Sequence, residues 1–100
     1  MKSSLTKQQI LQILKEKKSY IQQKYAIKKI GLFGSYAKNK NSDKSDVDIF
    51  VEMEPSLSNI LALKELLEKD LNKKVDLVRL RKNMNPYLKK RILEEGIYAV

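Results

Sequence analysis

The chain contains neither cysteine nor histidine. Without cysteine it can form no disulfide and no thiolate metal site, and without histidine it lacks imidazole bases, Ser-His-Asp triads and zinc–histidine centres. Any catalysis must therefore use carboxylates, hydroxyls, Lys, Arg, Tyr and bound ions. These groups favour hard metals with oxygen ligands, so Mg2+ is the expected ion and Mn2+ its alternative.

Long apolar runs are also missing. No segment approaches the roughly eighteen consecutive apolar residues of a membrane span, and the N-terminal MKSSLTKQQ leads into no signal-like apolar stretch. We expect a cytoplasmic protein without membrane association. The 100 residues suit a single domain over residues 1–100, too small to carry a second, substrate-binding domain. Any further substrate surface must come from a partner.

Acidic residues are outnumbered by basic ones. The chain has 21 Lys and Arg against 12 Asp and Glu, which gives a formal net charge of +9. The basic residues are spread along the whole chain and form no single patch in the sequence. Such a balance fits the binding of nucleic acid or of an acidic protein partner, and it fits a lysine-rich solvated surface equally well.

Apolar periodicity and turn residues predict alternating helices and strands. The predicted helices cover residues 5–24, a short segment from Ser35, residues 57–71 and a segment from Pro86. The predicted strands cover residues 26–33, 47–52, 74–80 and 97–100. This order predicts an α+β, two-layer fold of the α/β type, in which a sheet of three or four strands carries helices packed on one face.

One stretch, GSYAKNKNSDKSDVDIFV, combines groups that suit a nucleoside triphosphate and a divalent metal. Gly34 permits a backbone turn that no side chain would tolerate. Ser35 opens a short helix whose free N–H groups and hydroxyl can hold phosphate oxygens. Lys38 lies one turn further on, where its ammonium can reach the same phosphates.

Carboxylates complete the predicted site. Asp46 and Asp48 stand two apart in a strand, so they face the same side at about 7 Å between Cα atoms, close enough to share one divalent ion or bridge two. Asp76 lies within KVDLVRL, an apolar strand in which an unpaired charge would cost several kcal/mol. It is the candidate third carboxylate. Such sets serve phosphoryl and nucleotidyl transfer.

Together, Gly34-Ser35, the DVD at 46–48 and the VDLV around Asp76 resemble the minimal nucleotidyltransferases of the DNA polymerase beta superfamily. The resemblance implies the nucleotidyltransferase fold with a small mixed sheet. It also implies that Gly34 and Ser35 contact the triphosphate of ATP, that the paired aspartates bind two Mg2+ ions, and that Asp76 binds the second ion or helps activate the acceptor hydroxyl. The family commonly reads GS-x-A-R-G, whereas Lys38 here keeps the charge without the bidentate fork of arginine.

Free-standing proteins of this family are typically encoded beside a helical HEPN protein, and many pairs resemble toxin–antitoxin modules. The resemblance therefore implies an antitoxin that transfers AMP from ATP to a tyrosine of a HEPN toxin. The alternative is a catalytically weak binding module that neutralises a partner or binds nucleic acid by surface contacts. Transfer to a small molecule is disfavoured because no second domain remains to form its pocket.

Structural explanations exist for each part of the motif taken alone. Asp46 and Asp48 are also compatible with flanking a turn, and Gly34-Ser35 with an ordinary turn between a strand and a helix. Asp76 is also compatible with an ion pair to Arg79 or to a lysine. Tyr36 follows the serine and is placed near the nucleotide, with its role open.

Overall fold

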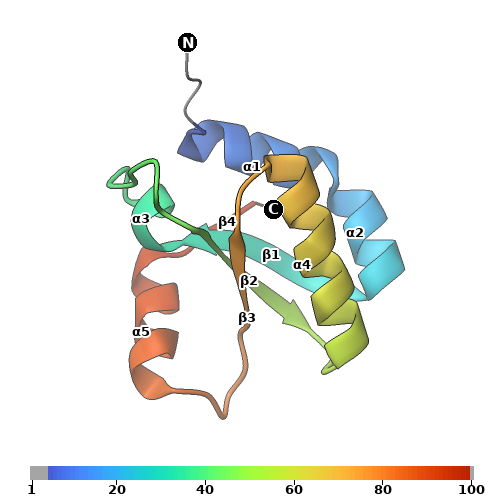
Figure 1. The fold of residues 1–100 in the computed structure, drawn as a ribbon. Coiled ribbons are helices and arrows are strands. Elements are labelled where there is room, and N and C mark those ends of the chain that lie inside the picture. The colour runs from blue at the N-terminus through green and yellow to red at the C-terminus, as the bar shows by residue number, and fades with distance from the viewer. Residues whose placement is uncertain (1–4, 100) are drawn as a thin grey trace.

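The structure, a computed structural model, describes residues 5–99. Its helices and strands alternate along the chain as the sequence predicts (Figure 1). The helices are α1 (Lys7–Glu16), α2 (Lys18–Tyr25), α3 (Gly34–Ala37), α4 (Leu57–Leu71) and α5 (Pro86–Glu95). The strands are β1 (Ile27–Phe33), β2 (Val47–Met53), β3 (Val75–Arg79) and β4 (Ile97–Tyr98). Within these residues, no helix is long and apolar enough to cross a membrane.

The strands form one mixed sheet in the order β3-β2-β1-β4. β1 pairs antiparallel with β2 and with β4, whereas β2 pairs parallel with β3. The prediction of a small mixed sheet is therefore confirmed, with four strands. The pairing register brings Phe33 of β1, Asp48 of β2 and Asp76 of β3 side by side across the sheet.

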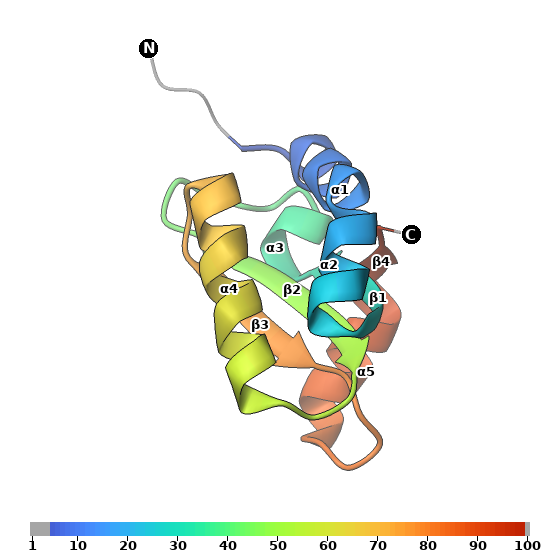
Figure 2. The same cartoon turned by 90° about the vertical axis from the view of Figure 1, so that its right-hand side faces the viewer.

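The two faces of the sheet bury different apolar clusters. Val47, Ile49 and Val51 belong to the main core, which α1, α2 and α4 cover (Figure 2). Phe50 points to the opposite face, where it packs with Phe33 and with Ile92 of α5. Helices α1, α2 and α4 thus form the predicted helical layer, and α5 adds a helix on the other side of the sheet (Figure 1). Helix α5 covers this second apolar cluster, and the cover is needed because exposed apolar area is costly.

Three helix starts follow from capping residues. Thr6 and Gln9 form a capping box at α1, in which each side chain accepts a hydrogen bond from the other residue's N–H. Ser56 caps α4, and Asn85 caps α5 with Pro86 at the first helical position. Each such cap contributes about 1 kcal/mol to helix stability, so the sequence fixes where these helices begin.

The prediction of one continuous helix over residues 5–24 is wrong. The helix ends at Glu16, and a second helix begins at Lys18. Lys17 at the junction has φ −91° and ψ 0°, and its ammonium lies 3.4 Å from the Asp70 carboxylate of α4. No side chain between residues 15 and 20 is buried. Packing therefore does not hold this stretch straight, and α2 turns to place Ile21 on the sheet.

Candidate active site

The predicted aspartates lie at one end of the central strands. Asp48 and Asp76 are direct neighbours in the parallel register of β2 and β3, and adjacent strands are about 4.8 Å apart. Asp46 immediately precedes β2, and its charge acts on the Asp48 carboxyl. The fold therefore brings together three carboxylates that the sequence separates by as many as 30 positions.

The turn at Gly34 is built against Asp48. Gly34 has φ +78°, in the left-handed region that favours glycine. A Cβ atom at this position would also run into the Asp48 carboxylate. The predicted need for glycine is thus confirmed for two reasons, backbone conformation and close approach. The close approach of Gly34 to Asp48 places the start of α3 directly beside this aspartate.

Asp48 carries the clearest electrostatic perturbation among the acidic groups. The pKa of its carboxyl is raised from 3.8 to about 6. Partial burial is the largest cause, the negative charges of Asp76, Asp46 and Glu95 act in the same direction, and Arg91 opposes the shift. Carboxylates crowded in this way gain from a cation between them. Their oxygens are the donors that Mg2+ prefers, so the residues fit that ion.

The acidic residues are not yet arranged as a closed ligand shell. Among residues 5–99, no three acidic side chains converge closely enough to surround a cation. Asp46 and Asp76 are exposed, whereas Asp48 is half-buried. Exposed side chains change rotamer readily, so Asp46 and Asp76 could turn toward a cation held at Asp48 without movement of the strands.

Replacing Asp48 with asparagine is expected to stabilise the metal-free protein at neutral pH. The raised pKa means that the native wild-type protein favours the protonated Asp48 carboxyl. The contribution of that proton to wild-type stability is present below about pH 4 and is lost as the pH rises through about 6. Asparagine removes the penalty, which we place at roughly 1 kcal/mol after discounting for solvent screening, or roughly 5 °C in Tm. Thermal unfolding in EDTA between pH 4 and pH 7.5 measures it. A difference in Tm between Asp48→Asn and the wild type that is equal at pH 4 and at pH 7.5 would contradict the raised pKa of Asp48.

Helix α5 adds charged groups to the site that the sequence analysis did not identify. The Glu95 carboxylate lies 3.3 Å from Lys38 Nζ and 3.6 Å from Arg91 Nη2. The Arg91 guanidinium stands over the Phe33 ring, 5.7 Å from its centroid. Only the spacing of Arg91 and Glu95, four apart on a helix, was visible in the sequence. Nothing there indicated that α5 covers the face that carries Asp48.

The structure tests one of the alternatives given above, the ion pair of Asp76 with Arg79. Asp76 and Arg79 are three apart in β3 and so point to opposite faces, and Arg79 donates to the Met53 carbonyl at 3.3 Å. Within residues 5–99, they do not form the ion pair considered above. The Tyr36 side chain is 2 % exposed and packs in the main core. Its ring is therefore a core side chain, and the prediction that places Tyr36 near the nucleotide stays a prediction.

Residues 8–99 match the family described as Polymerase beta, Nucleotidyltransferase. The chain belongs to this family. It is 45% identical over 98 residues to a relative from Methanocaldococcus jannaschii that is named a protein adenylyltransferase, covering 94% of this chain and 98% of the relative. It is 36% identical over 97 residues to the protein adenylyltransferase MntA of Thermococcus cleftensis, covering 95% and 97%. This chain is therefore a nucleotidyltransferase.

Solved structures support the same assignment of this nucleotidyltransferase. A structure described as a minimal nucleotidyltransferase superposes with a TM-score of 0.76 at 28% identity, covering 96% of this chain and 98% of the other. A chain from a crystal structure described as a toxin–antitoxin with AMP-PNP superposes with a TM-score of 0.70 at 26% identity, covering 86% and 72%. The predicted fold and family are confirmed.

Proposed function

We propose that this nucleotidyltransferase transfers AMP from ATP to a tyrosine hydroxyl of a HEPN-type toxin and thereby acts as an antitoxin. The observation that carries the proposal is the position of Asp48, which lies against the Gly34 turn on one side and beside Asp76 on the other. Relatives named protein adenylyltransferases support transfer of AMP to a protein. The similar toxin–antitoxin structure with AMP-PNP supports an adenine nucleotide and a toxin partner.

Each side chain of the site has a role in this proposal. Asp46 and Asp48 would hold Mg2+, with Asp76 completing the shell of a second ion. Bound Mg2+ would neutralise the leaving pyrophosphate and increase the acidity of the attacking hydroxyl. The N–H groups at Gly34 and Ser35 would hold the phosphates. Lys38, on the following turn, supplies positive charge next to them.

The transfer step is a substitution at the α-phosphorus. The tyrosine oxygen forms a bond to this phosphorus, the bond from the phosphorus to the bridging oxygen of the β-phosphate breaks, and pyrophosphate leaves with that electron pair. The hydroxyl proton passes to the Asp76 carboxylate, which is exposed at the start of β3 and so open to an incoming acceptor. Holding the acceptor and the phosphate in line accounts for much of the acceleration expected in such reactions.

The direct test is the intact mass of a purified HEPN toxin after incubation with this chain, ATP and Mg2+. We expect a gain of one or more AMP units, which disappears when EDTA replaces Mg2+, and we expect peptide mapping to place the gain on tyrosine. An unmodified toxin that the chain nevertheless neutralises would favour the alternative, a binding module. Modification without added metal would contradict the role of Mg2+.

Replacing Glu95 with glutamine is expected to tighten the binding of AMP-PNP with Mg2+ several-fold. The Glu95 carboxylate pairs with the cationic groups of Lys38 and Arg91, so it competes with a triphosphate for these two cations. It also adds negative charge near Asp48, which would repel the phosphates. Calorimetry measures the affinity, and Glu94→Gln, an exposed neighbour on the same helix, is the matched control. Weaker binding by Glu95→Gln alone would mean that Glu95 instead orients the two cations.

A further inference from the structure

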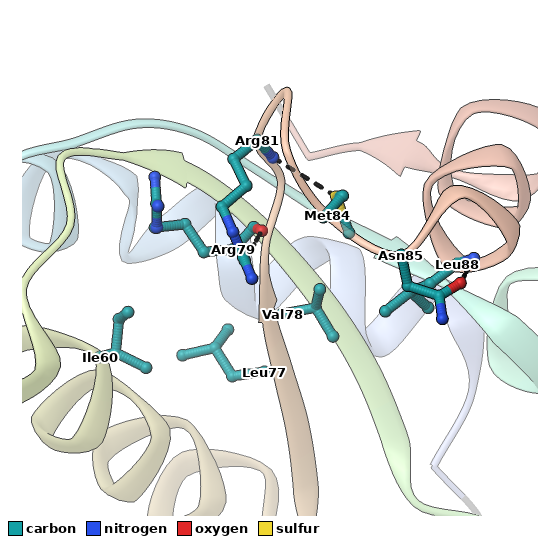
Figure 3. A pocket seen from close by; sticks show the side chains of 8 residues that line it. All are labelled: Ile60, Leu77, Val78, Arg79, Arg81, Met84, Asn85 and Leu88. Carbon is teal, nitrogen blue, oxygen red and sulfur yellow. Dashed lines mark hydrogen bonds between the residues drawn. The ribbon is translucent and has the colours of Figure 1, made fainter.

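A pocket of about 340 Å3 opens at the free edge of the sheet (Figure 3). Among the described residues, β3 pairs only with β2, so its other edge is free, and residues of β3 line this pocket. On one face of β3 the lining includes Leu77 and Ile60 of α4, which belong to the main core. On the other face it includes Val78, Met84 and Leu88, which belong to the cluster under α5. The pocket therefore wraps around an edge strand and offers apolar surface from both layers.

Leucines on α4 extend this apolar surface outward. Leu57 is 73% exposed and Leu61 is 53% exposed. With Ile60 they occupy positions i, i+3 and i+4 of the helix, so they form one continuous stripe that leads into the pocket. Contiguous apolar surface of this kind marks an interaction site more often than isolated exposed leucines do.

The rim of the pocket is basic. Arg79 donates to the Met53 carbonyl at 3.3 Å, and Arg81 donates to the Arg79 carbonyl at 3.0 Å. In the part of the chain that the structure describes, neither guanidinium takes part in an ion pair. Each guanidinium has five N–H donors, so both retain donors for a ligand. The carbonyl contacts hold these two charged side chains at the pocket.

The pocket is continuous with the catalytic face. Val78 in its lining and Asp76 in the site are two apart in β3, so their side chains share a face at about 7 Å between Cα atoms. Gly34 and Lys38, which would hold the phosphates, lie on the other side of Asp48, next to β1 and α5. An acceptor that approaches from the β3 edge therefore reaches Asp76 without crossing the place of the triphosphate.

We propose that this groove docks the protein acceptor, through a segment that presents apolar side chains flanked by carboxylates. The inference rests on the proposed function, since it places the acceptor of that reaction. Apolar side chains of the segment fill the space between Ile60, Leu77 and Leu88, and its carboxylates pair with Arg79 and Arg81. Charge complementarity selects this occupant, because Arg79 and Arg81 line the pocket, whereas Asp76, the acidic site residue on this strand, lies further along β3.

Negative charge introduced at the groove tests the proposal. Leu61→Glu and Arg81→Glu change exposed positions, and Lys15→Glu, at an exposed position of α1 outside the pocket lining, is the matched control. We expect each groove variant to bind a purified HEPN toxin about tenfold or more weakly, while its affinity for AMP-PNP stays at the wild-type value and Lys15→Glu behaves as wild type. Wild-type toxin affinity in both groove variants would overturn the docking site.

Photo-crosslinking identifies the occupant. A benzophenone amino acid replaces Leu61, or Lys15 as the control, and the crosslinked toxin peptide is sequenced. From the probe at position 61 we expect a toxin peptide that combines Asp or Glu with apolar residues. From the probe at position 15 we expect no crosslinked peptide. A basic toxin segment, or preferential crosslinking to an RNA oligonucleotide added in competition, would overturn the proposal. If the wild-type chain modifies the toxin but the toxin does not crosslink at the groove, the docking proposal fails and the proposed function remains. If the wild-type chain modifies no toxin, the proposed function and the docking proposal both fail.

Discussion

Replacing Asp48 with alanine is expected to lower the rate of AMP transfer by about a thousandfold or more. Asp48 is the central carboxylate of the three, because its neighbours are Asp76 in the register and the Gly34 turn. Its loss removes the carboxylate that lies between the Gly34 turn and Asp76 and that is proposed to hold Mg2+. Single-turnover transfer from labelled ATP to a HEPN toxin measures the rate.

The matched control for this variant is Glu54→Ala. Glu54 is an exposed acidic residue just beyond β2, paired with Lys28 at 3.5 Å, and exposed pairs contribute little to stability. We expect wild-type transfer from it. Residual transfer by Asp48→Ala within tenfold of wild type would contradict a metal-binding role for Asp48, and equal losses in both variants would indicate a general effect of removing surface charge.

Replacing Gly34 with alanine is expected to lower the free energy of unfolding by about 2–4 kcal/mol and to abolish transfer. The left-handed φ of +78° costs an L residue roughly 1–2 kcal/mol, and the new methyl group would displace the Asp48 carboxylate. For a domain of this size the Tm should fall by roughly 10 °C or more. Chemical denaturation and thermal unfolding measure the two quantities.

Two comparisons separate the causes of that loss. Asn39→Ala places alanine at another position with positive φ, 58°, in the loop after α3, and so gives the cost of alanine relative to asparagine in this backbone region. Combining Gly34→Ala with Asp48→Ala removes the carboxylate that the methyl group meets, so the double variant should be less destabilised than the sum of its parts. Additive losses would mean that Asp48 does not limit the space at Gly34.

Much of the site could be predicted because its parts are local. The alternation in β2 sends Val47 and Ile49 to the core and leaves Asp48 on the other face, which follows from the period of a strand. The glycine at 34 follows from the tight turn between β1 and α3. The starts of α1, α4 and α5 are local in the same way, since each capping residue bonds within one turn.

What the sequence did not predict depends on contacts between distant segments. The break at Lys17 arises because α2 must turn toward the sheet, although the apolar spacing continues across it. The place of Arg91 and Glu95 depends on α5 crossing to the face opposite α4, which no local pattern encodes. The groove at β3 depends on which strand lies at the edge, and strand order is a property of the whole sheet.

The measurement that tests the central claim most directly is calorimetric titration of AMP-PNP with and without Mg2+. It compares the wild-type chain with Asp46→Asn and Asp48→Asn, which keep side-chain size and remove charge. We predict binding by the wild type that requires Mg2+, and a loss of about tenfold or more of that binding in each variant. Binding of equal strength without Mg2+, or unchanged in both variants, would contradict a metal-dependent nucleotide site at the aspartates.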